Sequence, residues 1–363
     1  MAVRGLLPLV LLALLRGAGS AAAPPLRQVR WWSSHIDETV DMVYAHRRSV
    51  TGIYPCCGGP GTAANGSFEW DGTCERGTGR ATGTSSWVEA MAPLGLTVEN
   101  AAYVNGESLV SGAADDAIPA FVRCAVGLNL TGYMFDTESL GPMGSHVGGS
   151  DKQQAVLYSR WLGKLSAAMR KAGKTVGVTL SDWGLLYEYS LYAKAEVDHI
   201  MTMATYYNMA NSSSHASIGP LTKWSDKRQL WEAWLLTPQT AGWPTAAGVS
   251  PDVLSAGIGT VTTAGCGCRN GSRGCCDHIP SPLTDKAPAA QPMNFLPECH
   301  ALGAPGNCFF WTEPNLREFV QWCDSVARIR NVDVYRADFN ANSSAMRRTA
   351  PFFFSVLSEF LAR

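Results

Sequence analysis

The sequence lacks an excess of charge of either sign, and it has no run of like charges. It has 29 lysine and arginine residues and 30 aspartate and glutamate residues in 363 positions. Domains that bind nucleic acids or anionic membranes usually carry a basic patch or stripe. The balance therefore gives no indication of a nucleic-acid partner or of a charged membrane surface.

Beyond residues 1–23 the sequence also lacks an apolar run of about 20 residues, the length that a membrane-spanning helix needs. The first 23 residues combine Arg4, the apolar run Leu6–Leu15 and small residues up to Ala23. We interpret them as a signal peptide and expect a secreted or lysosomal protein with no membrane span. Asn-x-Ser/Thr sites at five positions fit a glycoprotein on that route: Asn65, Asn129, Asn211, Asn270 and Asn342.

Two hydrolase motifs are absent: the Gly-x-Ser-x-Gly elbow of serine hydrolases and the His-Glu-x-x-His helix of zinc proteases. The spacing Gly59-x-Gly61-x-x-Ala64 is superficially similar to a dinucleotide loop. The proline, the paired cysteines and the absence of a following helix argue against a nucleotide site. We therefore expect no cofactor.

The 11 cysteines suit an oxidising compartment, where they predict up to five disulfides and one remaining thiol. Cys266, Cys268, Cys275, Cys276 and His278 form a cluster that could also be read as a metal site. The cluster lies in a glycine-rich insertion, and disulfides are the favoured interpretation there. We expect no metal site.

Apolar strand-like segments alternate with helical patterns along the chain, which is typical of a parallel sheet buried on both faces. The clearest helix covers 152–172, with Gly173 as its stop. Eight strands are predicted, at 27–33, 50–54, 96–103, 130–138, 175–182, 199–207, 254–260 and 307–313. Eight strands predict a (β/α)8 TIM barrel over 24–330 with long Cys/Gly-rich loop insertions. Residues 331–363 would be an extension packed on it, and 332–335 either an extra edge strand or a sign that one early assignment is wrong.

The fourth predicted strand ends in two carboxylates, Asp136 and Glu138. Side chains of a strand alternate between its faces, so Gly132, Met134, Asp136 and Glu138 share one face. In a parallel barrel that face is the interior, and the carboxyl end of the strand opens at the active-site mouth. An acid pair in this position favours catalysis, although capping of a loop by the two acids is the alternative.

This strand end resembles glycoside hydrolase family 18, the chitinase and chitobiase group of TIM barrels. The family's fourth strand ends in Asp-Gly-x-Asp-x-Asp-x-Glu, and here the aligned residues run from Thr131 to Glu138. Gly132, Asp136 and Glu138 match. Two further similarities are Tyr207 and Asn208, which match a Met-x-Tyr-Asp/Asn type motif with the Met displaced to Met203, and Trp311 near a strand end.

The resemblance implies a hydrolase that cleaves N-acetylhexosaminide linkages in chitin-type oligosaccharides or glycans, with the substrate's acetamide as nucleophile. Glu138 would be the general acid, and Asp136 would orient the acetamide. Tyr207 would donate a hydrogen bond to the acetamide oxygen, and Trp311 would stack under the sugar. Asn208, Trp183 and Met134 complete the expected substrate-binding residues, and a carbohydrate is the expected partner.

Met134 is the main departure, because it replaces the inner aspartate that exchanges charge with the residue at Asp136 in the family. The alternative function is therefore a chitinase-like protein that binds sugars without cleaving them. A third and weaker interpretation is a divalent cation held by Asp136 and Glu138.

Overall fold

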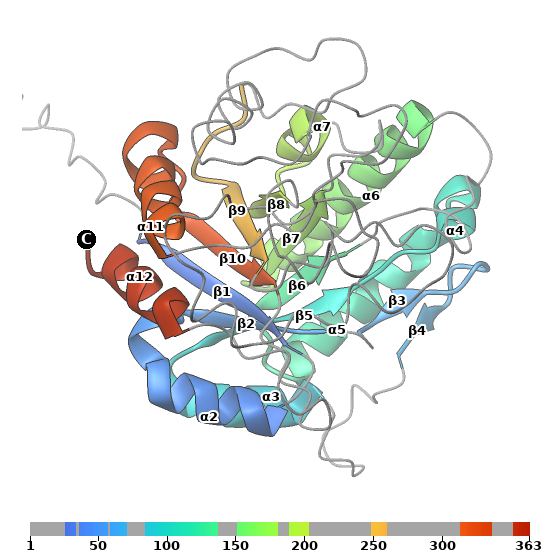
Figure 1. Cartoon of the computed structure of the whole chain (residues 1–363). Helices are drawn as coiled ribbons and strands as arrows, with labels where there is room; N and C mark the ends of the chain where they lie inside the picture. The colour runs from blue at the N-terminus through green and yellow to red at the C-terminus, as the bar shows by residue number, and fades with distance from the viewer. Residues whose placement is uncertain are drawn as a thin grey trace, which may run out of the picture.

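Eight parallel strands form a closed barrel in this computed structural model, which describes residues 26–33, 36–56, 59–70, 84–136, 151–180, 189–202, 248–259, 313–335 and 351–363 (Figure 1). The strands are β1 (Gln28–Ser33), β2 (Gly52–Pro55), β5 (Thr97–Ala102), β6 (Gly132–Phe135), β7 (Thr175–Leu180), β8 (His199–Thr202), β9 (Leu254–Gly259) and β10 (Asn331–Tyr335). A short hairpin of β3 (Gly61–Thr62) and β4 (Phe68–Glu69) follows β2. The predicted (β/α)8 fold class is confirmed.

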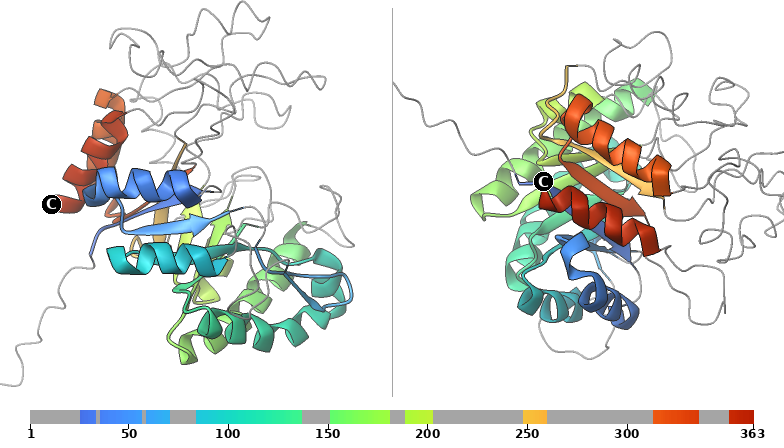
Figure 2. Two further views of the ribbon diagram at one scale, coloured as in Figure 1. Left: turned by 90° about the horizontal axis from the view of Figure 1, so that it is seen from below. Right: turned by 60° about the vertical axis from the view of Figure 1, so that its left-hand side comes forward.

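Helices surround the barrel, as the views in Figures 1 and 2 show. They are α2 (Ile36–His46), η1 (Arg47–Ser49), α3 (Thr84–Met91), η2 (Ala92–Leu94), α4 (Gly106–Ser111), η3 (Ala113–Ala117), α5 (Ile118–Gly127), α6 (Asp151–Lys171), α7 (Tyr189–Lys194), α11 (Glu313–Trp322), η6 (Cys323–Ala327) and α12 (Pro351–Ala362). Among the described residues no helix is long and apolar enough to cross a membrane.

Helix α6 follows directly from its sequence. Tyr158, Leu162, Leu165 and Met169 recur at helical spacing, and all four side chains are fully buried. The helix ends where Gly173 adopts a left-handed conformation, which lets Lys174 N–H donate back to the Met169 carbonyl. The predicted helix and its glycine stop are confirmed.

The barrel is closed by β10, which pairs with β9 on one side and with β1 on the other. The sequence predicts an eighth strand at 307–313. Of this segment the structure describes Glu313, which begins α11, so the prediction is wrong at that residue. A closing strand must pair on both sides, and 331–335 does so while burying Val332 and Val334. The barrel therefore extends beyond residue 330, and α12 packs on α11, η1 and β1.

Several expectations fall outside the described residues. These are the signal peptide at 1–23, the cysteine cluster at 266–276, and the sequence stretches 137–150 and 203–247. The one cysteine that the described part of the chain leaves free is Cys323, which is buried in η6.

The barrel interior holds an ion network built from five strands. Arg30 Nε donates to Asp333 Oδ1 at 3.1 Å, and Arg30 Nη1 lies 3.6 Å from Glu99 Oε2. His199 Nε2 lies 3.2 Å from the same Glu99 oxygen and 3.2 Å from the Tyr54 hydroxyl, which donates to Asp333 at 3.1 Å. All five side chains are buried, so each charge depends on the others for its stabilisation.

Interior glycines make room for this network. A Cβ on Gly177 would lie 2.0 Å from His199 Nε2, and a Cβ on Gly132 would lie 2.2 Å from the Thr175 hydroxyl that donates to Glu99. Gly177 is therefore required by the His199 ring, and Gly132 by Thr175, which bonds to Glu99.

Gly177→Ala should lower the free energy of unfolding by about 1 to 3 kcal/mol, because the new methyl group overlaps the His199 ring. Denaturant unfolding measures this. Gly163→Ala is the matched control: it lies in α6, where a Cβ would make ordinary contacts of 3.5 Å or more, so helix propensity should leave stability equal or higher. Equal losses in both variants would contradict the packing argument.

Glu99 should make stability fall in acid. Burial alone would raise the pKa of its carboxyl, but His199, Arg30 and the Thr175 hydroxyl favour the charged form and lower the pKa to about 2. Because the folded pKa lies below the ordinary value of 4.5, this stabilisation is present above about pH 4.5 and is lost as the pH falls through 2.

Glu99→Gln should cost about 3 to 5 kcal/mol at neutral pH, because it removes one of the two carboxylates beside the buried Arg30 guanidinium. Its stability should also depend less on pH between 2 and 5, as measured by urea unfolding at each pH. Asp115→Asn, which breaks a half-exposed pair with Lys164, should cost at most about 1 kcal/mol. A pH dependence unchanged by Glu99→Gln would refute the role of this carboxyl.

Candidate active site

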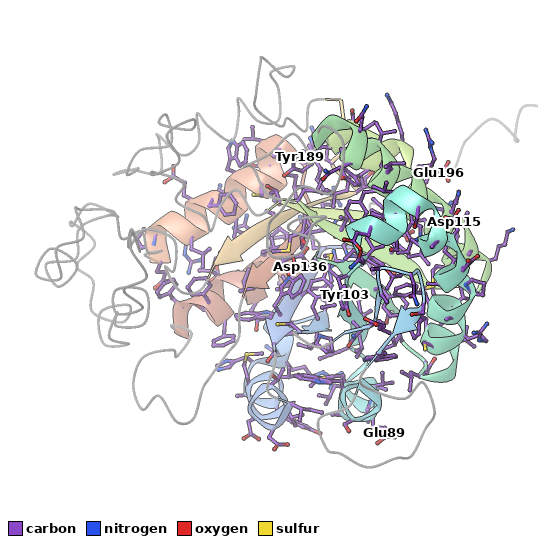
Figure 3. The ribbon with its side chains drawn as sticks, turned by 90° about the vertical axis from the view of Figure 1, so that its right-hand side faces the viewer. Glu89, Tyr103, Asp115, Asp136, Tyr189 and Glu196 are labelled. Atoms are coloured by element: carbon purple, nitrogen blue, oxygen red, sulfur yellow. The ribbon has the colours of Figure 1, made fainter. Side chains whose placement is uncertain are left out.

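Asp136 stands at the carboxyl end of β6, the fourth strand of the barrel in chain order. Its backbone N–H donates to the Ala102 carbonyl at 2.9 Å, which continues the β5–β6 ladder by one residue. Figure 3 shows Asp136 near the centre of the molecule, whereas Glu89 and Glu196 lie at its edge. The expected position of this acid at the end of the fourth strand is confirmed.

The two faces of β6 also behave as its sequence predicts. Tyr133 and Phe135 point outward and pack edge-on against Phe121 and Trp161 of the surrounding helices. Met134 points into the barrel with no exposed surface. Asp136, two residues further, shares the face of Met134.

Within the described residues, Thr179 of β7 forms the side-chain hydrogen bond to Asp136. Its hydroxyl donates to Asp136 Oδ1 at 2.6 Å and lies 3.2 Å from the Phe135 carbonyl oxygen. Burial raises the pKa of the Asp136 carboxyl above its usual value, and the hydrogen bond from Thr179 offsets part of that rise. The site therefore holds a carboxyl that takes up a proton more readily than an exposed aspartate.

An apolar layer separates Asp136 from the ion network beneath it. Trp32, Ala101, Met134 and Met201 form a buried cluster inside the barrel with the ring of Tyr54, whose hydroxyl belongs to the network. Trp32 Nε1 donates to the Met201 sulfur at 3.3 Å. Met134 contributes a thioether where a relay of protons would need an ionisable group. The network and the candidate catalytic acid are thus separate polar regions of one barrel interior.

Tyr103 stands beside Asp136 at the end of the neighbouring strand. The two residues directly follow the paired Ala102 and Phe135 on β5 and β6. The Tyr103 ring rests on Gly61, where a Cβ would lie only 2.2 Å from a ring carbon, and Tyr103 as a residue is 42% exposed. An exposed, supported aromatic ring at a barrel mouth is a surface on which an apolar ligand face can stack.

Of the predicted site residues, the structure places Asp136 and Met134 on one face of one strand. The others lie outside the described residues: Glu138, Trp183, Tyr207, Asn208 and Trp311. Sequence reasoning missed Tyr103, Thr179 and the ion network. A signal existed for the network, since Arg30, Glu99 and Asp333 are charged residues within otherwise apolar strands.

Metal ligation has no support in the described part of the chain, where no group of three or more His, Cys, Asp or Glu side chains could hold an ion. The arrangement instead offers one carboxyl of raised pKa, one hydroxyl donor and one exposed aromatic ring. Such groups can exchange a proton with a bound ligand and orient it.

No protein-family model matches the sequence, and no curated protein matches it. Solved structures do match. A chitinase from Bacteroides thetaiotaomicron is 11% identical with a TM-score of 0.59, and the match covers 93% of this chain and 97% of that one. A family 18 chitinase from Flavobacterium johnsoniae is 10% identical with a TM-score of 0.53, covering 93% and 94%.

The Group IV chitinase of Ostrinia furnacalis in complex with allosamidin is 13% identical, with a TM-score of 0.55 and coverage of 93% and 99%. Identities this low establish a shared architecture and leave the chemistry open. The chain therefore has the (β/α)8 barrel fold of family 18 chitinases, carried by a divergent sequence.

Proposed function

We propose that the protein is a glycoside hydrolase that cleaves N-acetylhexosaminide linkages of chitin-type oligosaccharides or glycoprotein glycans. The observation that carries the proposal is Asp136: a carboxyl at the end of the fourth strand of a chitinase-like barrel, on its interior face and bonded to the Thr179 hydroxyl. Glu138 follows two residues later in the sequence.

In this reaction Glu138 donates its proton to the glycosidic oxygen, while the acetamide oxygen of the substrate attacks C1 and displaces the leaving sugar. Asp136 orients the acetamide and stabilises the positive charge of the cyclic oxazolinium. Water then attacks C1, gives its proton to Glu138 and restores the acetamide, so configuration at C1 is retained. Tyr207 and Asn208 would contact the acetamide, and Trp183 and Trp311 the sugar ring.

Binding without cleavage is the second candidate function, and Met134 favours it. The residue beneath Asp136 is an apolar, fully buried thioether, which cannot exchange a proton with the acid during a catalytic cycle. A barrel of this kind would keep the aromatic surface at its mouth and lose turnover.

A secreted or lysosomal location belongs to the same proposal. It rests on the interpretation of residues 1–23 as a signal peptide and on the five glycosylation motifs. Asn65 and Asn129, the two motif asparagines within the described residues, are both exposed. Exposure is what attachment of a glycan requires.

Glu138→Gln tests the enzymatic function. It keeps size and hydrogen bonding but removes the transferable proton, so hydrolysis of N-acetylglucosamine oligosaccharides should fall by about 10²- to 10⁴-fold. Binding of allosamidin, measured by calorimetry, should persist. Glu89→Gln is the control, because Glu89 is exposed on α3 at the edge of the molecule (Figure 3).

Three outcomes would count against this mechanism. Full activity in Glu138→Gln would show that Glu138 is not the general acid. Efficient cleavage of 2-hydroxy sugars would show that the substrate acetamide is not the nucleophile. Binding of the oligosaccharides by the wild-type protein without any hydrolysis would establish the second function instead.

Tyr103→Ala should weaken binding of N-acetylglucosamine oligosaccharides by about 1 to 3 kcal/mol, because an exposed stacking surface is lost at the mouth. Tyr103→Phe, which keeps the ring, should bind nearly as well as wild type. Tyr44→Ala serves as the control, since Tyr44 is 64% exposed but lies on the outer helix α2. Unchanged affinity in a folded Tyr103→Ala variant would exclude this tyrosine from the site.

A further inference from the structure

Thr179 lies beside Asp136 on the adjacent strand, on the same interior face. The pairing of Phe135 with Val178 brings the next residues of β6 and β7, Asp136 and Thr179, together. Thr179 is buried, and its hydroxyl reaches Asp136 Oδ1 at 2.6 Å. Its position is therefore set by the barrel ladder, independently of any loop.

The Thr179 hydroxyl has one proton and two acceptors within reach: Asp136 Oδ1, and the Phe135 carbonyl oxygen at 3.2 Å. A hydroxyl donates one strong hydrogen bond at a time. It donates to the carboxyl when Asp136 is ionised, because a charged acceptor forms the stronger bond. It can turn to the carbonyl when Asp136 is protonated. The Thr179 hydroxyl therefore has an acceptor in both protonation states of Asp136: the carboxylate in one and the Phe135 carbonyl in the other.

Other polar side chains of the interior lie elsewhere. Tyr103 directly follows β5 and lies next to Asp136. Five titratable or charged groups form the separate ion network: Arg30 on β1, Tyr54 on β2, Glu99 on β5, His199 on β8 and Asp333 on β10. Within the described ranges, these five bond to one another and to Thr175, and the side-chain bond to Asp136 comes from Thr179.

We propose that Thr179 is the positioning residue of Asp136, orienting its carboxylate in place of the acid that Met134 replaces. The inference rests on the proposed function for its chemistry, because Asp136 is useful to an oxazolinium only when it is charged and correctly turned. Thr179 itself touches no reacting atom. It acts by fixing Oδ1 of Asp136, and no side chain of the described residues bonds to Oδ2.

Removal of the Thr179 hydroxyl should change the protonation of Asp136 in a defined direction. The bond favours the ionised carboxylate, and burial opposes it. Without the bond, the ratio of protonated to ionised Asp136 should rise by about 10- to 100-fold, which is a shift of about one to two pH units. Since the ionised form is the active one, the acid limb of the kcat/KM profile should move to higher pH.

The test compares Thr179→Val, Thr179→Ala and Thr179→Ser in the full chain. Val and Ala remove the hydroxyl, and Ser retains it. The pH dependence of kcat/KM is measured on N-acetylglucosamine oligosaccharides, and thermal unfolding confirms that each variant is folded. Thr39→Val is the matched control, because it also removes a fully buried threonine hydroxyl, one that pairs with Ser33. The Val and Ala profiles should shift, and the Ser and Thr39→Val profiles should remain at the wild-type position.

A second measurement separates this inference from the proposed function. The protonation of Asp136 is followed directly by carbon-13 NMR of labelled aspartate carboxyls, with Asp136→Asn identifying the resonance. A midpoint raised in Thr179→Val or Thr179→Ala supports the positioning role even if the wild-type protein hydrolyses no substrate, a result that defeats only the proposed function. An unshifted midpoint in folded variants overturns the role of Thr179, whatever the activity.

Discussion

The buried pairing of Arg30 with Asp333 is the interaction on which the barrel depends. It joins the first strand to the last, and Glu99, Tyr54 and His199 attach three further strands to it. Burial opposes the charge of the Arg30 guanidinium, but Asp333, Tyr54 and Glu99 raise its pKa, so it remains charged. A charge in this position can be stabilised only if all contributing strands are in register. The network thus favours one alignment of the closed sheet over its shifted alternatives.

The same network determines where chemistry can take place. The polar side chains of the network require glycine on neighbouring strands, as His199 requires Gly177. Trp32, Met134 and Met201 form the buried apolar layer between this network and Asp136. Asp136 therefore begins a new polar region at the barrel mouth, with Thr179 as its described donor. In a chain with an inner acid at the position of Met134 these two regions would be continuous. Here Asp136 has no ionisable side chain next to it on the interior face of β6, because Met134 occupies that position.

Much of this architecture could be predicted from local sequence. The helical spacing of apolar residues predicts the buried face of α6, and Gly173 predicts its end. The alternation of side chains along β6 predicts which of them face inward. The eighth strand could not be found this way, because the apolar run ending at Trp311 and the segment at Val332 read equally well as strands. Pairing on both sides decides between them. Thr179 and Asp136 are 43 residues apart, and Arg30 and Asp333 are 303 apart, so neither pair leaves a short-range pattern.

The closing position of β10 has a consequence for biosynthesis. A chain leaves the ribosome from its amino end, so Arg30 emerges long before Asp333, the carboxylate that pairs with it. Until then β1 and β9 each have an open edge, and contacts this distant in sequence form slowly. Until β10 is available, both of these edges stay unpaired. The closing strand therefore also removes two edges at which another chain could pair.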